Sequence, residues 1–402
     1  MIRNTSYCRC MALLTLFGPL RQPIFMRNPS SDVLLLWIWN GVFSAAAQNY
    51  GFDWYVVPED NTPDLESSDL HAVESIAGTP HALAVGSSDM ILYSEDWGLS
   101  WTRQYTGLGR DAHWYGAEIL EENAGIIAWI VGTGGRVMKT VDGGAIWEEQ
   151  ISGLGFGSSI NLRGVQSFDG RHVWVVGDVG TVLRSLDGGV TFELLELPSP
   201  YKQSDLYDVH FKDPSRGWVV GSLNGTILYS AQRGLSWFPR TVNGAMDWET
   251  TYALHFVSLL ELWAVGERGG VLHSTDTGRT WKVIDLMSDC FPTLGPDVPK
   301  PHFLDVWVDD VTSQGFIVGS RGDVVCTSFD QGATWSNHSV PGGSPEVPQS
   351  AVASFSLPTT KRAVMVGADA GLYYWYDNSP PPSPPSPPPP PLPPPYPPPI
   401  PP

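Results

Sequence analysis

The chain has 402 residues, of which 42% are hydrophobic, and it contains 42 glycines, 36 prolines and 17 tryptophans. This composition is typical of short strands joined by many turns and disfavours a mainly helical fold. The formal net charge of −19 argues against a nucleic-acid partner and against attachment to an anionic membrane, because both require the opposite sign.

Residues 1–47 are predicted to be a targeting segment. They contain four arginines and a single acid, Asp32, so the rest of the chain has 19 basic and 41 acidic residues and a net charge of −22. An apolar run at 33–43 is too short to span a bilayer. It precedes Gln48 and the small residues of a cleavage site, Ala45 and Ala47.

The start codon decides which membrane is crossed. Translation from Met26 would give an ordinary secretory signal, whereas translation from Met1 gives a two-part chloroplast signal leading to the thylakoid lumen. In both cases the mature protein is expected to be exported, non-cytosolic and without a spanning segment.

A pattern in Val176–Phe192 repeats along the chain. An apolar run closes on Val-Gly, a short turn and a second apolar run follow, and the unit ends in Ser-x-Asp-x-Gly-x-x-aromatic. The Val-Gly pair recurs at 85/86, 131/132, 176/177, 220/221, 265/266, 318/319 and 366/367. A repeat of roughly 45 residues with four strands predicts an all-β, seven-bladed β-propeller of four-stranded blades.

The Ser-x-Asp-x-Gly turn has its own chemistry. Its serine and aspartate can accept hydrogen bonds from backbone N–H groups of the turn, and its glycine can adopt a positive φ. We therefore predict a structural role for the aspartates of these turns, which are Asp96, Asp142, Asp187, Asp276 and Asp330. A degenerate copy from Ser230 to Trp237 has Gln232 in place of the aspartate.

The last unit lacks a strand that the N-terminus can supply. After Val366-Gly367 the chain reaches Asp377 without a closing aromatic strand, while 53–58 aligns with the strands that follow the turn motif elsewhere. We predict that this N-terminal strand, anchored by Trp54, completes the last blade and closes the ring. Deleting Gly51–Val57 should then destabilise the whole domain.

Residues 285–302 form the longest insertion, and the cysteines form no framework. Cys290 in this insertion and Cys326 near the end of a third strand are expected to be too far apart for a disulfide. The spacing of the residues indicates no metal site and no cofactor. Two glycosylation acceptors, at Asn224 and Asn337, fit a secretory route.

The C-terminal segment 379–402 is proline-rich and should adopt a polyproline II conformation of roughly 70 Å. It is similar to the hydroxyproline-rich segments of plant and algal cell-wall glycoproteins; a docking ligand and a plain spacer are the alternatives. The predicted domains are therefore 1–47, 48–378 for the propeller and 379–402.

The repeats resemble those of the seven-bladed photosystem II assembly and stability factor family of cyanobacteria and chloroplasts. The resemblance covers about 50–377 and depends on the turns above together with Val176–Leu183, Leu206–Phe211 and Gly217–Gly221. It implies a protein-binding propeller in the thylakoid lumen that escorts a reaction-centre subunit through an arginine-rich patch. The corresponding residues in and beside the turns after Val-Gly are Arg136, Arg163, Arg268, Arg321 and Asp178.

A glycoside hydrolase or sialidase is the enzymatic alternative. Glu74 and Glu118 occupy matching positions on adjacent first strands and are the best available carboxylate pair. The same position in later repeats holds Gln166, His210, His255 and Trp307, which instead suggests a ring lining a central channel. We therefore expect a monomeric, non-enzymatic scaffold with no catalytic residues. A secreted cell-wall or adhesion glycoprotein with a propeller head is the remaining alternative.

Overall fold

The computed structural model describes residues 24–27, 33–39, 42–46 and most of 53–376. Within 53–376 the gaps are 59–60, 64, 66–67, 123–124, 156, 245–247, 292–298, 311–312, 321–324, 339–348, 355–361 and 369–370. The predicted proline-rich tail lies outside the described residues. Strands β1 (Ile24–Arg27), β2 (Val33–Trp39) and β3 (Val42–Ala46) form an antiparallel sheet in a unit separate from Asp53–Tyr376. No helix in the described part of the chain is long and apolar enough to cross a membrane.

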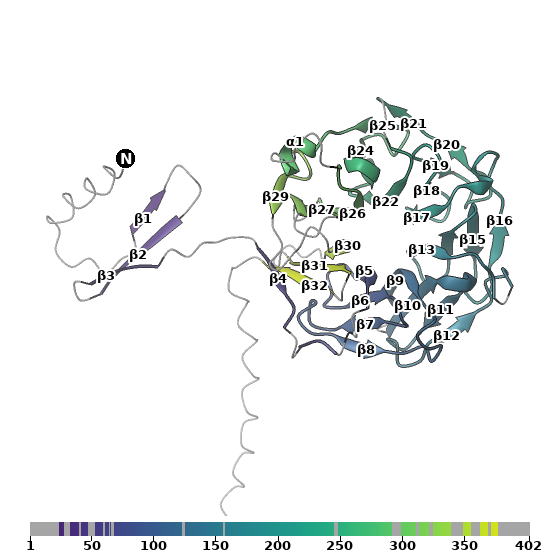
Figure 1. The fold of residues 1–402 in the computed structure, drawn as a ribbon, viewed down its shortest axis with the longest axis horizontal. Helices are drawn as coiled ribbons and strands as arrows, with labels where there is room; N and C mark the ends of the chain where they lie inside the picture. Colours follow the sequence, from purple (N-terminus) through teal and green to yellow (C-terminus); the bar gives the residue numbers. More distant parts are fainter. Residues whose placement is uncertain are drawn as a thin grey trace, which may run out of the picture. The chain divides into compact units, whose positions relative to one another are not determined.

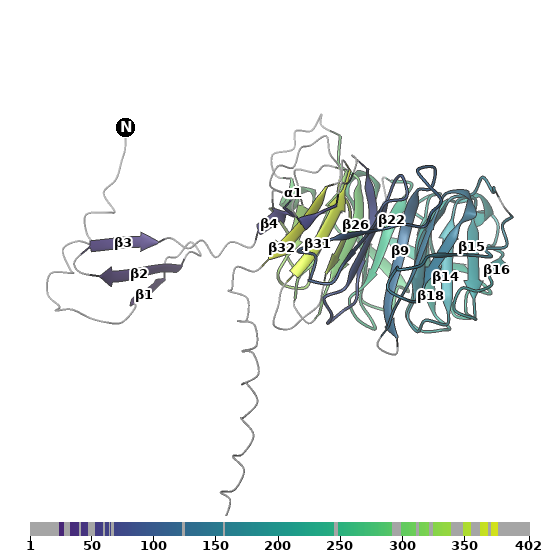
Figure 2. The ribbon, with the colours of Figure 1, turned by 90° about the horizontal axis from the view of Figure 1, so that it is seen from below.

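Residues 53–376 form an all-β propeller, whose antiparallel sheets surround a central axis (Figure 1). In most sheets the chain runs from the innermost strand outward (Figure 1), and Figure 2 shows the strands crossing the thickness of the ring from one face to the other. The first three sheets are β5 (Leu70–Ser75), β6 (Ala82–Gly86), β7 (Ile91–Ser94) and β8 (Thr102–Gln104); β9 (Trp114–Glu122), β10 (Gly125–Gly132), β11 (Val137–Thr140) and β12 (Glu148–Gln150); and β13 (Leu162–Ser167), β14 (Val173–Gly177), β15 (Thr181–Ser185) and β16 (Glu193–Leu195).

The following sheets repeat this order, with one added strand. They are β17 (Leu206–Phe211), β18 (Gly217–Gly221), β19 (Ile227–Ser230) and β20 (Phe238–Pro239); β22 (Thr251–Phe256), β23 (Leu262–Gly266), β24 (Gly270–Ser274) and β25 (Thr280–Val283); and β26 (Phe303–Val308), β27 (Gly315–Gly319), β28 (Val325–Ser328) and β29 (Ser336–His338). The short strand β21 (Thr241–Asn243) pairs in parallel with β25. Three 3-10 turns are η3 (Thr133–Gly135), η4 (Tyr201–Gln203) and η5 (Glu267–Gly269).

The remaining sheet joins the two ends of the propeller. It contains β30 (Gln349–Ser354), β31 (Arg362–Gly367), β32 (Leu372–Tyr376) and the N-terminal strand β4 (Asp53–Val56). Strand β4 is antiparallel to β32, with Trp54 opposite Trp375 in the register. The predicted completion of the last sheet by the N-terminal strand is therefore confirmed.

The second strands of the sheets are mostly apolar because both of their faces are covered by neighbouring sheets. All five residues of β6, β14, β18 and β23 are buried. One cluster joins Trp174 and Val176 of β14 to Val209 and Phe211 of β17, with the rings of Trp174 and Phe211 stacked at 3.7 Å. Burial between sheets explains why these strands lack the apolar and polar alternation of a half-exposed sheet.

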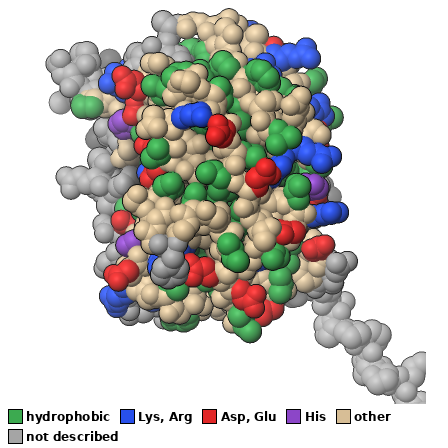
Figure 3. Space-filling view, turned by 90° about the vertical axis from the view of Figure 1, so that its right-hand side faces the viewer, with side chains coloured by type: hydrophobic (Ala, Val, Ile, Leu, Met, Phe, Trp, Pro, Cys, Tyr) green, Lys and Arg blue, Asp and Glu red, His purple; other side chains and the backbone are tan. Residues whose placement is uncertain are grey.

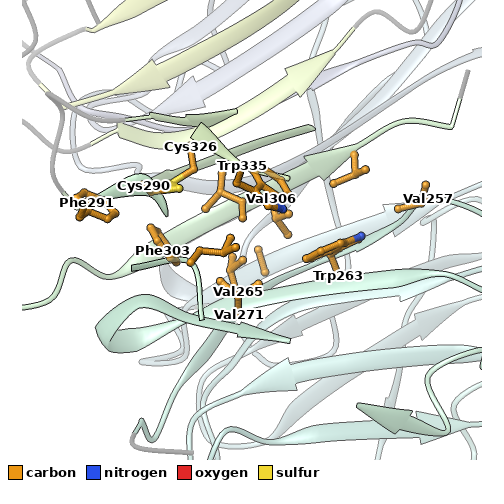
Figure 4. Close-up of a cluster of buried hydrophobic side chains, with 14 residues drawn as sticks. Val257, Trp263, Val265, Val271, Cys290, Phe291, Phe303, Val306, Cys326 and Trp335 are labelled. Atoms are coloured by element: carbon orange, nitrogen blue, oxygen red, sulfur yellow. A yellow bond between two sulfur atoms is a disulfide. The ribbon is translucent and has the colours of Figure 1, made fainter. Parts of the chain in front are cut away.

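The structure contradicts the expectation that Cys290 and Cys326 lie far apart. They form a disulfide, with Cα atoms 5.6 Å apart (Figure 4). In the described part of the insertion, a short helix, α1 (Met287–Cys290), lies beside β29, and Asn337 Nδ2 donates a hydrogen bond to Cys290 O at 2.9 Å. Cys290 and Cys326 are both buried in a cluster with Phe303. Sequence spacing missed this pairing because it depends on the path of the insertion.

Candidate functional site

The predicted ring of equivalent positions lines a central cavity. Side chains from the innermost strands enclose about 490 Å³, and they include Glu74, Glu118, Gln166, His210, His255 and Trp307. The sequence-based prediction that these positions share one lining is confirmed. The cavity is also lined by Asp208 and Asp305, which lie two residues before His210 and Trp307 on the same strands.

Several lining side chains bind the backbone of the next sheet. Ser167 N donates to Glu118 Oε2 at 3.0 Å, and Phe211 N donates to Gln166 Oε1 at 3.1 Å. One sheet further, Leu254 N donates to Asp208 Oδ2 at 2.9 Å. His255 Nε2 lies 2.8 Å from Val308 O and donates to it in the matching tautomer. The inner ring is therefore held together by polar side chains that connect neighbouring sheets.

Confinement in the channel shifts the titration of its side chains. Burial raises the pKa of Glu118 to about 8 and that of Asp208 to about 6. Each carboxylate also accepts hydrogen bonds from backbone N–H groups, which lower the pKa but do not offset the effect of burial. The pKa of Glu74 is also raised, mainly because the surrounding protein removes water from its carboxylate and then because Glu118 has the same charge. The side chain of Glu74 nevertheless remains exposed to the channel. Burial lowers the pKa of His210 to about 3 and that of His255 to about 4. At neutral pH both imidazoles are therefore uncharged.

The turns with Ser-x-Asp-x-Gly contain the expected hydrogen bonds. In the turn after β15, Gly189 N donates to Ser185 Oγ at 2.8 Å, and Thr191 N donates to Asp187 Oδ1 at 3.0 Å. Ser185 Oγ also donates to Asp187 Oδ1, at 2.7 Å. The hydrogen bonds to the Asp187 carboxylate, led by that from Thr191 N, lower its pKa to about 2. The bonds from the turn serine or threonine and from the residue four beyond the aspartate recur at Asp96, Asp142, Asp276 and Asp330.

A tryptophan of the preceding sheet packs against several of these turns. Trp129 Nε1 and Lys139 Nζ both donate to Gly188 O, at 3.1 and 2.7 Å. Equivalent tryptophans Trp174, Trp218 and Trp263 lie beside the turn glycines Gly234, Gly278 and Gly332. Sequence reasoning did not find this contact, although the spacing Trp-x-Val-Gly is the same in all four repeats.

The two sets of turns lie at opposite ends of the sheets. Gly177 of a Val-Gly pair is opposite Thr181 at one end of the β14–β15 pair, and Val173 is opposite Ser185 at the other. We call the end with the turns after Val-Gly the Val-Gly face, defined by turns such as Thr133–Gly135 and Glu267–Gly269.

The side of the ring in Figure 3 has basic and acidic side chains interspersed with apolar ones.

The predicted partner-binding residues are only partly brought together. Arg163 Nε pairs with Asp178 Oδ1 at 2.5 Å, and Asn161 Nδ2 donates to Asp178 Oδ2 at 3.0 Å. Arg136 lies 3.7 Å from Glu149 and lines a separate hollow of about 760 Å³. Arg268 lies in η5, in the left-handed region with φ of 52°. Arg321 falls outside the described residues.

A group of aromatic side chains surrounds Arg163 at the Val-Gly face. The guanidinium carbon lies 4.9 Å from the ring centroid of Tyr207 and 5.8 Å from that of Tyr115. Tyr207 meets Tyr252 edge-on at 5.1 Å, and Tyr115 lies 5.3 Å from His71. Each of these residues is the second residue of an innermost strand. We call the group the aromatic rim, and its members are His71, Tyr115, Arg163, Tyr207 and Tyr252. Sequence reasoning singled out Arg163 but not its aromatic neighbours, although they share its repeat position.

Comparison with known proteins supports the resemblance drawn from the repeats. The family model described as photosynthesis system II assembly factor YCF48 matches residues 111–202 and 199–294, which confirms this resemblance. Photosystem II stability/assembly factor HCF136, chloroplastic, of Oryza sativa subsp. japonica is 36% identical over 85 residues, 20% of this chain and 20% of that protein. Photosystem II assembly lipoprotein Ycf48 of Synechococcus sp. (strain CC9902) is 35% identical over 91 residues, 21% and 26% of the two chains. The matched segments thus span about a fifth to a quarter of these relatives.

Solved structures agree on the fold. YCF48 from Cyanidioschyzon merolae has a TM-score of 0.60 at 15% identity, covering 81% of this chain and 98% of that one. A structure titled YCF48 bound to D1 peptide has a TM-score of 0.60 at 17% identity, covering 81% and 94%. The GH74 xyloglucanase from Xanthomonas campestris has a TM-score of 0.57 at 15% identity, covering 80% and 53%. At these identities the likeness establishes the propeller fold alone.

Proposed function

Because residues 111–294 match the photosystem II assembly factor family, we propose that this chain is a non-enzymatic propeller scaffold that binds a photosystem II reaction-centre subunit. The family match carries the proposal. It includes Arg136, Arg163, Asp178 and Arg268, which we propose as partner-binding residues together with Arg321. The solved YCF48 structure with a D1 peptide supports a peptide segment as the bound partner. We further propose that the propeller acts as a monomer without nucleic acid.

The test of this function is affinity capture. Tagged full-length protein is mixed with detergent-solubilised thylakoid membranes, and the recovered proteins are identified by mass spectrometry. We expect a reaction-centre subunit to be enriched with the wild-type chain and depleted with Arg163→Ala. Capture that recovers no photosystem II subunit would refute the proposal. Arg110→Ala is the matched control, because Arg110 is an exposed arginine in the loop before β9.

We propose the thylakoid lumen as the location, with residues 1–47 removed on export. The disulfide between Cys290 and Cys326 supports an oxidising compartment, since such bonds are rare in the cytosol. Fluorescence of a C-terminally tagged chain, together with the N-terminus of the purified protein, checks both points. We expect a chloroplast signal and a mature N-terminus at Gln48.

The second candidate is a secreted cell-wall or adhesion glycoprotein with 379–402 as its stalk. The proline-rich composition of the tail favours it, and the disulfide fits this route equally well. Secretion of the tagged chain with hydroxylated, glycosylated prolines would select it over the lumenal scaffold. Unmodified prolines in a chloroplast-located chain would eliminate it.

The ring is also proposed to have seven blades. Support comes from the sheets of β5–β8, β9–β12, β13–β16, β17–β20, β21–β25, β26–β29 and β30–β32 with β4, each of which contains one Val-Gly pair. A crystal structure of the mature chain counts the blades directly, and any other number would overturn this part of the proposal.

We propose that the channel carboxylates are structural rather than catalytic. Glu118 holds the Ser167 N–H of the next sheet, which supports a role in cohesion between sheets. The likeness to GH74 xyloglucanase concerns the fold only. Purified chain should release no sugar from xyloglucan, and activity that disappears in Glu74→Gln or Glu118→Gln would contradict this assignment.

A further inference from the structure

Within the aromatic rim, one cation, the guanidinium of Arg163, is bound by aromatic rings and a carboxylate. The guanidinium of Arg163 lies against the rings of Tyr115 and Tyr207 and pairs with the carboxylate of Asp178. Aromatic faces attract cations through their quadrupole, and a neighbouring carboxylate adds charge attraction. Two tyrosine rings and one carboxylate therefore bind the guanidinium of Arg163.

The next sector of the rim has the same groups. Tyr207 and Tyr252 stand edge to face. Burial raises the pKa of Tyr207, and the charges of Asp205 and Glu267 act in the same direction, against that of Arg163. Tyr252 Oη donates to Glu267 Oε1 at 3.4 Å, and Glu249 N donates to Glu267 Oε2 at 3.2 Å. In the described part of the chain, no arginine or lysine lies over the ring of Tyr252, whereas Arg163 lies over that of Tyr207.

The charge of this region favours a positive occupant. Burial acts to raise the pKa of Glu267, but hydrogen bonds from Glu249 N, Thr250 and Tyr252 have a larger effect in the opposite direction. The pKa of Glu267 is therefore lowered, and the side chain is ionised at neutral pH. Asp205 Oδ1 accepts a hydrogen bond from Val179 N at 3.0 Å, which orients a second carboxylate beside the rim. Arg163 is already paired with Asp178. The adjoining η5 turn contains one basic residue, Arg268.

We propose that the aromatic rim binds a positively charged, arginine- or lysine-bearing extended segment of a protein partner, with a cationic side chain seated against Tyr207 and Tyr252 beside Asp205 and Glu267. The half-buried tyrosines leave ring surface accessible at the Val-Gly face. This inference rests on the proposed protein-binding function and adds the charge of the recognised segment.

Peptide binding to the full-length chain tests the charge preference. Three fluorescein-labelled dodecapeptides share a glycine and serine background and contain four arginines, four glutamines or four glutamates. Fluorescence anisotropy at low and high salt measures their Kd. We expect the arginine peptide to bind at least about tenfold more tightly than the glutamate peptide, with affinity falling as salt screens the carboxylates. Equal or tighter binding of the glutamate peptide would overturn the proposal.

Variants locate the binding on the rim. Removing the ring in Tyr252→Leu should weaken the arginine peptide about two- to fivefold, while Tyr252→Phe keeps the ring and should bind like wild type. Glu267→Gln should weaken it about two- to fivefold and reduce the salt dependence. Glu148→Gln, at an exposed acid on the outer strand β12, is the matched control and should change nothing. An equal loss in Glu148→Gln and Glu267→Gln would refute a rim site.

The two proposals fail in distinguishable ways. Capture of a photosystem II subunit that is unaffected in Tyr252→Leu and Glu267→Gln, with no arginine-peptide preference, would overturn the rim site and leave the scaffold function standing. Rim-dependent binding of the arginine peptide without capture of any photosystem II subunit would support the rim site and refute the scaffold function. Circular dichroism checks that each variant is folded, and Glu267→Gln retains the test where Tyr252→Leu unfolds.

Discussion

Gly278 offers the sharpest test of how neighbouring sheets are joined. It is buried in the turn after β24, has a φ of +65°, and a Cβ built on it would lie 2.4 Å from Nε1 of Trp218 in the preceding sheet. Trp218 is fully buried and its ring contacts Phe256 at 5.0 Å, so it has little room to move. Gly278→Ala therefore adds both backbone strain and an overlap between sheets.

The magnitude follows from these two effects. A left-handed conformation costs a non-glycine residue about 1–2 kcal/mol, and an extra methyl group in a packed interior costs about 1–3 kcal/mol. We expect Gly278→Ala to lose about 2–5 kcal/mol of unfolding free energy in total. Gly107→Ala is the matched control, because Gly107 has a φ of +81° and nothing within 4 Å of the added Cβ. It should lose only about 1–2 kcal/mol.

Urea unfolding followed by tryptophan fluorescence measures both losses. Replacing Trp218 with phenylalanine in the Gly278→Ala background should recover part of the difference, because the smaller ring leaves room for the methyl group, and a double-mutant cycle isolates this coupling. Equal destabilisation by Gly278→Ala and Gly107→Ala, or no coupling to Trp218→Phe, would show that the turn glycine is needed for its φ alone.

Further predictions concern the turns, the channel, the disulfide and ring closure. Asp187→Ala removes the hydrogen bonds from Thr191 and should cost about 1 kcal/mol or somewhat more by urea unfolding, with partner capture unchanged; lost capture by a folded variant would contradict it. The raised pKa of Glu118 means that its contribution to stability is full below about pH 4.5 and is lost as pH rises through about 8, so Glu118→Gln should flatten the unfolding free energy between these values; an unchanged profile would refute this. Cys326→Ser should lower stability by about 2–4 kcal/mol and expose 285–302 to protease, whereas reductant should have no further effect on the variant. Deleting Gly51–Val57 removes β4 and should lower the melting temperature of the whole propeller, and a melting temperature equal to that of wild type would refute the closure.

Local chemistry explains what could be predicted from the sequence. The Ser-x-Asp-x-Gly turns depend on hydrogen bonds within a few residues, such as Gly189 N to Ser185 Oγ, so each copy predicts its own geometry. The apolar runs before Val-Gly predict one strand of each repeat. Repetition of these local units predicted a propeller, the pairing of β4 with the last sheet, and the alignment of Glu74 with His210 in one lining.

Contacts between sheets could not be predicted in this way. Three kinds of contact join residues from different sheets or from an insertion and a sheet. They are the disulfide of Cys290 and Cys326, the stacking of Arg163 with Tyr207, and the tryptophans beside the turn glycines Gly189, Gly234, Gly278 and Gly332. Their distances depend on the rotation between neighbouring sheets and on the path of long loops, which no local pattern specifies. Local patterns in the amino-acid sequence were therefore enough to predict the repeating unit and the pairing of β4 with the last sheet. Which side chains meet across the sheets could be seen only in the folded molecule, because these contacts depend on how the units pack rather than on how each one folds.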